Sequence, residues 1–395
     1  MEREQATKFI YDLLRALTSR RGSDLFLTSG FPPAMKIDGK MTPVSQQVLT
    51  GGHTSMLIRS IMNDRQAAEF EANKECNFAI SPAGIGRFRV NCFVQMGQVG
   101  AVLRVITTTI PNFEDLRLPA VLKDVAMTKR GLVLFVGATG SGKSTSLAAM
   151  IGYRNENPHG HIVTIEDPVE FIFQNKKSIV NQREVGTDTQ TLEIALKNAL
   201  RQAPDCILIG EIRDKPTMSM ALAYAQTGHL CLATLHANNS YHAMNRIINF
   251  YPLETRASLL LDLAAALQAV ISLRLVRIKS GARVPAVEIL LNTRNISELI
   301  EKGEISEIKE ALEKSLAPGS QTFEQALFKL FMEGKITQDE ALANADSASN
   351  MLWLINQATA GELSLNGAPK PPAKPSDEKK DTLSGFTDFK INVNA

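Results

Sequence analysis

Nine consecutive residues combine the amino acids that phosphate binding requires. They are Gly137, Ala138, Thr139, Gly140, Ser141, Gly142, Lys143, Ser144 and Thr145. An apolar run, 132–136, precedes them and an amphipathic stretch follows. In a strand–loop–helix context, glycines let successive backbone N–H groups point at a phosphate, and the following helix adds its positive end. A glycine turn that only joins a strand to a helix is the alternative, and nine matching positions disfavour it.

The same residues predict the ligand. The Lys143 ammonium is placed to reach the β- and γ-phosphates of a nucleotide, and the Ser144 hydroxyl is placed to hold Mg²⁺. We therefore expect a site for ATP and Mg²⁺ here, and hydrolysis of the bound nucleotide.

Two carboxylates follow apolar, strand-like runs farther along the chain. Glu166 follows 162–165 and Glu211 follows 206–210. Hydrolysis needs an acid near the metal and a group that orients or deprotonates the attacking water, each normally at the C-terminal end of a strand. Glu211 is suited to be the acid that holds the metal or polarises its water. The residues alone leave the assignment of the general base open between the two.

Two histidines and an arginine complete the set of candidates. His229 and His236 bracket an apolar run, 230–235. A lone histidine is more often a satisfied structural group. At the end of a strand, however, His236 is placed to sense the γ-phosphate. Arg213 follows Glu211 by two residues, and we expect it to pair with an acid or to face a neighbouring subunit.

Residues 1–108 carry no phosphate-binding pattern and predict a small α+β domain. From Arg87 the sequence alternates: Arg87, Arg89 and Asn91 project to one side, and apolar residues to the other. A second strand, 99–106, follows a turn and completes a hairpin. A solvated edge face is, from these residues alone, as good an explanation of the two arginines as a functional role.

The remaining chain predicts an α/β fold. After a linker at 109–118, residues 119–359 alternate apolar strand-like runs with helical stretches, which is typical of a parallel sheet covered by helices on both faces. After about residue 260 the pattern becomes helical, with an apolar stripe that includes Leu261, Leu267 and Val270. Residues 360–395 are rich in proline and lysine and predict a disordered tail, with a short apolar segment at 386–393.

Composition excludes several classes of function. The 395 residues include 43 Lys and Arg against 41 Asp and Glu, a net charge of +2, which argues against a nucleic-acid-binding surface. The start lacks a secretory signal, and no run approaches the ~18 apolar residues of a membrane span. We therefore expect a cytoplasmic protein. The four cysteines form no Cys-x-x-Cys pair, so no zinc site is expected.

Four segments together resemble the Walker A, Asp, Walker B and His boxes of the secretion ATPases. They are Gly137–Thr145, Ile165-Glu-Asp-Pro-Val-Glu170, Ile209-Gly-Glu-Ile-Arg-Asp214 and Thr227-Gly-His-Leu-Cys-Leu-Ala-Thr-Leu-His236. Within that superfamily the chain is most similar to the retraction ATPases of type IV pili, through Gly86-Arg-Phe-Arg-Val-Asn91 and Val180-Asn-Gln-Arg-Glu184 among others.

The resemblance implies a PAS-like N-terminal domain, a RecA-like C-terminal domain with further helices, and a homohexameric ring. It also implies that Arg87, Arg89 and Arg104 reach the phosphates of a nucleotide held between the two domains. By the same resemblance, Glu166 is the general base and Glu211 holds Mg²⁺ or polarises water.

Two departures from the PilT-like pattern favour the PilU-like branch of these retraction ATPases, an accessory to a PilT-like ATPase. Ser297 and Glu298 stand where PilT-like proteins have an arginine and an asparagine, and a Pro/Lys-rich tail is added. The resemblance further implies an inner-membrane platform protein (PilC-like) as partner, at the cytoplasmic face of the inner membrane at the pilus base.

The sequence leaves three alternative functions to compare. The first is an ATP-driven motor that supports pilus retraction and twitching motility. The second is a nucleotide-gated ring adaptor that docks on the partner motor and whose own hydrolysis is dispensable. The third, a DNA-translocating motor, is disfavoured by the balanced charge and by the absence of a basic, aromatic-interleaved segment.

Overall fold

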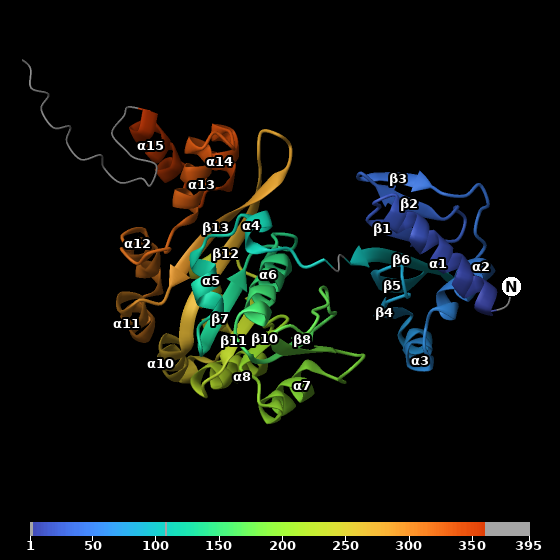
Figure 1. Ribbon diagram of the computed structural model, residues 1–395, viewed down its shortest axis with the longest axis horizontal. Helices are drawn as coiled ribbons and strands as arrows, with labels where there is room; N and C mark the ends of the chain where they lie inside the picture. The colour runs from blue at the N-terminus through green and yellow to red at the C-terminus, as the bar shows by residue number, and fades with distance from the viewer. Residues whose placement is uncertain (1–2, 107–108, 360–395) are drawn as a thin grey trace, which may run out of the picture.

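Two β-sheets, each with its own apolar core, organise the chain (Figure 1). The structure is a computed structural model that describes residues 3–106 and 109–359. The predicted tail at 360–395 therefore lies outside the described residues. None of the helices in the described ranges combines the length and apolar character that crossing a lipid bilayer requires.

The N-terminal sheet has six antiparallel strands in the order β3-β2-β1-β6-β5-β4. Its strands are β1 (Asp24–Leu27), β2 (Ala34–Ile37), β3 (Lys40–Pro43), β4 (Glu75–Ile80), β5 (Arg87–Gln95) and β6 (Gln98–Ile106). Three helices complete this part: α1 (Arg3–Ser19), α2 (Gly51–Ser60) and α3 (Asp64–Asn73). Apolar residues of α1 and α2 share one cluster with the sheet, as expected of a sheet that buries one face.

The predicted hairpin is present and has the predicted faces. Phe88, Val90 and Cys92 are fully buried, whereas the residues between them are exposed or half-buried. In the register of β5 and β6, Arg89 lies opposite Arg104. The period of two places both arginines on the face that does not pack on the core.

The second sheet has seven strands in the order β13-β12-β7-β11-β10-β8-β9. They are β7 (Gly131–Val136), β8 (Gly160–Glu166), β9 (Ser178–Glu184), β10 (Cys206–Ile209), β11 (Leu230–Leu235), β12 (Leu267–Arg277) and β13 (Arg283–Leu291). All neighbours are parallel except β12 and β13. Every residue of β7, β10 and β11 is buried, which explains why these strands read as continuous apolar runs.

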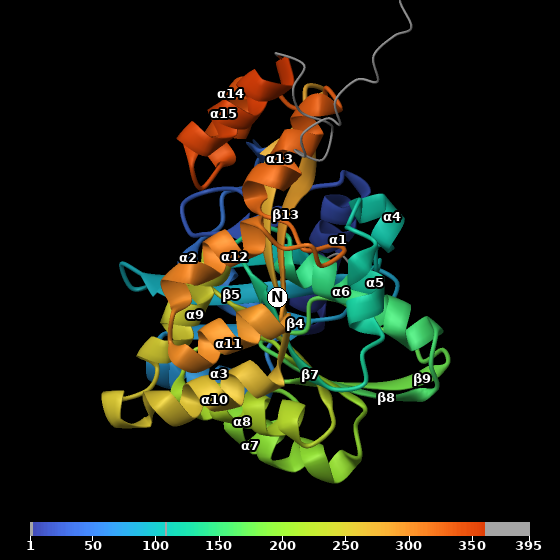
Figure 2. The same ribbon diagram turned by 90° about the vertical axis from the view of Figure 1, so that its left-hand side faces the viewer.

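Helices cover both faces of this sheet (Figure 2). On one face pack α4 (Phe113–Leu116), α5 (Val121–Ala126) and α6 (Lys143–Glu156), and on the other α7 (Leu192–Ala199), α8 (Lys215–Gln226), α9 (Ser240–Asn249), α10 (Arg256–Ala266), α11 (Arg294–Lys302) and α12 (Ile308–Glu313). Along β7, Leu132 and Leu134 join one cluster while Val133 and Phe135 join the other. The predicted α/β fold is confirmed.

The prediction of a purely helical pattern after residue 260 is wrong. Helix α10 ends at Ala266, and the chain continues as β12, which pairs with β7 and then with β13. Leu267 and Val270 are buried in the sheet, and Leu261, from the same predicted stripe, is 58% exposed. Consecutive apolar and β-branched residues at 269–271 suit a strand buried on both faces, which periodicity does not separate from a buried helix.

Three helices close the described chain: α13 (Phe323–Met332), α14 (Gln338–Asn344) and α15 (Ala348–Thr359). They pack on the far end of the β12–β13 hairpin around a small apolar cluster (Figure 1). The only tryptophan, Trp353, lies on α15 and is 57% exposed.

The four cysteines are all buried thiols, as the sequence predicted. Cys76 on β4 lies opposite Cys92 on β5 in the antiparallel register. Cys206 and Cys231 lie on the neighbouring strands β10 and β11. Burial raises the pKa of Cys206 to about 12, so this thiol stays protonated and unreactive near neutral pH.

Candidate active site

The loop between β7 and α6 has the backbone conformation that its glycines permit. Gly137, Gly140 and Gly142 have φ angles of 148°, 78° and 95°, a region that favours glycine. A side chain at Gly137 would lie 2.7 Å from the backbone oxygen of Leu273. The loop therefore depends on glycine for both conformation and space. Helix α6 begins directly after Gly142.

Lys143 lies against this loop. Its Nζ donates hydrogen bonds to the carbonyl oxygens of Gly137, at 2.8 Å, and Ala138, at 2.9 Å. Burial lowers the pKa of Lys143, and the nearby charge of Glu211 acts in the opposite direction. The ammonium is therefore held by the loop, next to the carboxylate that the sequence proposes for the metal.

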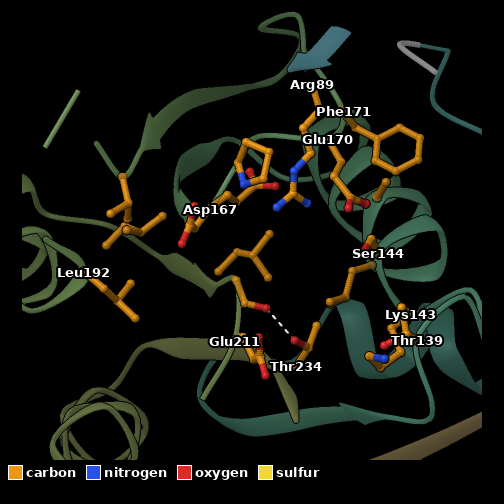
Figure 3. A pocket seen from close by; sticks show the side chains of 18 of the residues that line it. Arg89, Thr139, Lys143, Ser144, Asp167, Glu170, Phe171, Leu192, Glu211 and Thr234 are labelled. Atoms are coloured by element: carbon orange, nitrogen blue, oxygen red, sulfur yellow. Dashed lines mark hydrogen bonds between the residues drawn. The ribbon is translucent and has the colours of Figure 1, made fainter. Parts of the chain in front are cut away.

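The predicted residues converge on one cavity of about 390 Å³ at the C-terminal ends of the strands (Figure 3). Its lining includes Thr139, Gly140, Lys143, Ser144, Glu166, Glu211, Arg213, His236 and, from the N-terminal sheet, Arg89. Ligands of open α/β sheets bind at this edge. The cavity therefore joins candidate phosphate-binding, metal-binding and water-activating groups in one space.

Glu166 lies at the end of β8, and two neighbours hold its carboxylate. The Thr164 hydroxyl donates to Oε1 of Glu166 over 2.7 Å, and the amide of Gln182 donates to the same atom over 3.4 Å. Burial raises the pKa of Glu166, and both hydrogen bonds act against that rise. A carboxylate whose pKa is raised in this way is a stronger proton acceptor once ionised.

Glu211 follows β10, the strand next to β8. Its Oε2 accepts a hydrogen bond from Arg213 Nε at 2.7 Å, and its Oε1 lies 3.4 Å from His236 Nε2. The preceding residue must be small, because a side chain at Gly210 would meet Glu166 Cα at 3.2 Å. The absence of a side chain at Gly210 therefore lets the end of β10, which carries Glu211, lie close to the end of β8, which carries Glu166.

The two histidines occupy opposite ends of β11. His236 lines the cavity, and burial, followed by the charge of Lys143, lowers its pKa. A neutral imidazole is thus favoured there, which can donate one N–H and accept at the other nitrogen. His229 lies at the start of β11, where its ring contacts Thr227 and the carbonyl oxygen of Tyr224. The structure therefore does not bring His229 to the cavity.

Among the three predicted arginines, the structure brings Arg89 to the cavity. Arg104 is 69% exposed in its side chain and donates from Nε to Asp24 at 2.7 Å. Arg87 forms an ion pair with Glu184 on β9. Carboxylates outside the cavity therefore hold Arg87 and Arg104.

Three residues near the cavity were missed as functional candidates: Thr164, Gln182 and Glu184. Gln182 and Glu184 alternate on β9, so both project toward the segment that follows β8. A signal was available, because the resemblance to the secretion ATPases already included residues 180–184. Their partners were not predictable, since they come from a neighbouring loop and from the other domain.

Known proteins resemble this chain over most of its length. The family described as Type II/IV secretion system protein matches residues 7–310. Among curated relatives, the type IV pilus ATPase PilU of Pseudomonas aeruginosa is 53% identical over 87% of this chain and 90% of its own. The type IV pilus retraction ATPase PilT of the same organism is 40% identical over 86% and 99%.

A solved structure extends the likeness to three dimensions. The crystal structure of the pilus retraction motor PilT with bound ADP has a TM-score of 0.81 and 38% identity, and the match covers 86% of this chain and 98% of that one. The fold is therefore shared with the pilus retraction motor PilT.

Proposed function

Because the chain belongs to the family of type II/IV secretion system proteins, among the type IV pilus retraction ATPases, we propose that it is an ATP-hydrolysing motor that supports pilus retraction and twitching motility. The observation that carries this proposal is the convergence of Lys143, Glu166 and Glu211 on one cavity. Phosphoryl transfer requires mostly positioning and electrostatic stabilisation, and these residues supply both.

ATP is the nucleotide that we propose, with Mg²⁺ as its metal. The Ser144 hydroxyl and the Glu211 carboxylate line the same cavity and offer the hard oxygen ligands that Mg²⁺ takes alongside phosphate oxygens. They would hold the ion, which neutralises the charge on the phosphates when bound. The Gly137–Thr145 loop and Lys143 then bind the phosphates, and Arg89 approaches from the N-terminal domain.

We assign the proton acceptor to Glu166. Its carboxylate has the raised pKa that suits a general base, whereas Glu211 is engaged by Arg213. His236, neutral and beside Glu211, is placed to donate an N–H to the nucleotide and so to register its state. Arg213 fixes the orientation of the Glu211 carboxylate.

The cellular role that we propose is that of a PilU-like accessory motor. It forms a homohexameric ring and acts with a PilT-like ATPase on a PilC-like platform protein, at the cytoplasmic face of the inner membrane. The higher identity to PilU than to PilT supports this branch. So do Ser297 and Glu298 on α11, because their residue types depart from the PilT-like pattern. In the structure Ser297 donates to the carbonyl oxygen of Ala264, and Glu298 pairs with Arg294. No nucleic acid partner is proposed.

The decisive experiment compares variants in phosphate release and nucleotide binding. Glu166→Gln should retain binding of a fluorescent ADP analogue and lose hydrolysis by a factor of about 100 or more, while Lys143→Ala should lose turnover altogether. Wild-type phosphate release by Glu166→Gln would overturn the assignment. In cells, pilus retraction that persists with Glu211→Ala, but not without the protein, would favour the ring adaptor instead.

A further inference from the structure

The ion pair between Arg87 and Glu184 connects the two domains at a buried point. The Glu184 side chain is 6% exposed and that of Arg87 16%. Arg87 also donates from Nε to the carbonyl oxygen of Val169 at 3.1 Å and from Nη1 to the Ser81 hydroxyl at 3.1 Å. The guanidinium therefore has acceptors from both domains, which define its position.

Glu184 also holds the segment that follows the proposed general base. Its Oε2 accepts a hydrogen bond from the backbone N–H of Val169 at 3.1 Å, and its Oε1 accepts one from the Thr187 hydroxyl at 3.1 Å. The next residue, Val185, donates its N–H to the carbonyl oxygen of Glu166 at 2.9 Å. The end of β9 therefore binds both ends of the segment 166–169.

The remaining contacts of β9 reinforce this attachment. The Gln182 side chain accepts from the N–H of Phe173 at 2.8 Å and donates to the carbonyl oxygen of Phe171 at 2.7 Å. It also reaches the Glu166 carboxylate. Thus β9 fixes the backbone on which Glu166 stands, and Arg87 fixes the last residue of β9.

We propose that Glu184 is a positioning residue for ATP hydrolysis: it receives Arg87 from the N-terminal domain and thereby sets the segment that carries Glu166. Docking of the N-terminal domain and alignment of the general base are then one event, because both use the same carboxylate. This inference rests on the proposed ATPase function and adds to it a coupling between domain contact and catalysis.

The test uses the full-length protein with Glu184→Gln, Arg87→Met and the double variant. Glu184→Gln removes the charge that Arg87 requires, and its single amide oxygen can no longer accept from both Val169 and Thr187. We expect kcat to fall about tenfold or more, since small displacements of a catalytic group cost up to about 100-fold, while KM and the affinity for a fluorescent ADP analogue stay within about twofold. The double variant should be no slower than Glu184→Gln, because the contact between Arg87 and Glu184 is already broken there.

A second readout needs no hydrolysis. Backbone amides in 167–173 should exchange hydrogen faster in Glu184→Gln than in the wild type, because Val169 loses a well-placed acceptor. Glu193→Gln is the matched control: its pair with Lys197 on α7 is exposed, so kcat and exchange should not change. If Glu184→Gln melts below the assay temperature, Arg87→Lys tests the pair from its other side.

The outcomes separate the two levels of inference. Unchanged kcat and unchanged exchange in Glu184→Gln would overturn the role of Glu184, as would effects of the two single variants that multiply in the double variant. If the wild-type protein releases no phosphate from ATP, the proposed function fails, and the exchange measurement still decides whether Glu184 holds the segment.

Discussion

The hydroxyl of Thr164 gives a direct way to move the pKa of the proposed general base. Thr164 is fully buried, and its only side-chain hydrogen bond in the described structure goes to Glu166 Oε1, at 2.7 Å. Thr164→Val replaces that hydroxyl with a methyl group. A hydrogen bond to a charged group contributes about 1.5 to 3 kcal/mol, and one pKa unit corresponds to about 1.4 kcal/mol. The substitution should therefore raise the pKa of Glu166 by about one to two units.

The sign of the effect on activity follows from the role of Glu166. A general base must be ionised, so kcat/KM falls as the pH drops through its pKa. Removing a hydrogen bond that favours the ionised form raises this pKa. The acid limb of the pH profile of kcat/KM should therefore move to higher pH by the same amount, about one to two units.

The assay is phosphate release at subsaturating ATP across the range from about pH 5 to about pH 9. Thr234→Val is the control, because the Thr234 hydroxyl donates to the carbonyl oxygen of Gly210 and not to a carboxylate (Figure 3). It should leave the position of the acid limb in place. An acid limb that does not move in Thr164→Val, or moves equally in both variants, would show that Glu166 is not the proton acceptor.

Two further predictions concern a buried carboxylate and the N-terminal arginines. Glu288 is 4% exposed and accepts from the Ser240 N–H and the Ser272 hydroxyl; burial raises its pKa above the usual 4.5, so the folded state binds more protons and stability falls as the pH rises above 4.5. Glu288→Gln should remove this loss. Measured by urea unfolding, the free energy of unfolding of the variant relative to the wild type should be about 1 kcal/mol or more higher at about pH 8 than at about pH 5. An equal difference between variant and wild type at both pH values would contradict the prediction. Arg89→Ala should lower kcat/KM in phosphate release about tenfold or more, whereas Arg104→Ala, outside the cavity, should change it far less; the reverse order would refute the assignment.

The local parts of the site were predictable from the sequence. The phosphate-binding loop depends on glycines and a lysine within nine consecutive positions, and Glu166, Glu211 and His236 each follow a short apolar run of the kind that forms a buried strand. Parallel strands bring such ends to one edge of a sheet. For this reason, four residues spread over about a hundred positions could be expected in one cavity before any coordinates were considered.

The non-local parts were not predictable. The Arg87–Glu184 pair joins residues 97 positions apart, and nothing in either local pattern identifies the other. Likewise, the apolar stripe after residue 260 matched a helix, although its second half joins β7 as a strand. Tertiary pairing decided both outcomes, and single-sequence periodicity contains no information about it.

The burial of all four cysteines has a practical consequence for measuring movement between the domains. Maleimide dyes react with accessible thiolates, and the native thiols are enclosed in strands and protonated near neutral pH. A cysteine introduced at an exposed position, such as Glu193 or Asn91, would thus take up a label selectively without prior removal of the natural ones. A pair of such labels, one on each domain, would report the distance between the two domains in an otherwise unaltered chain.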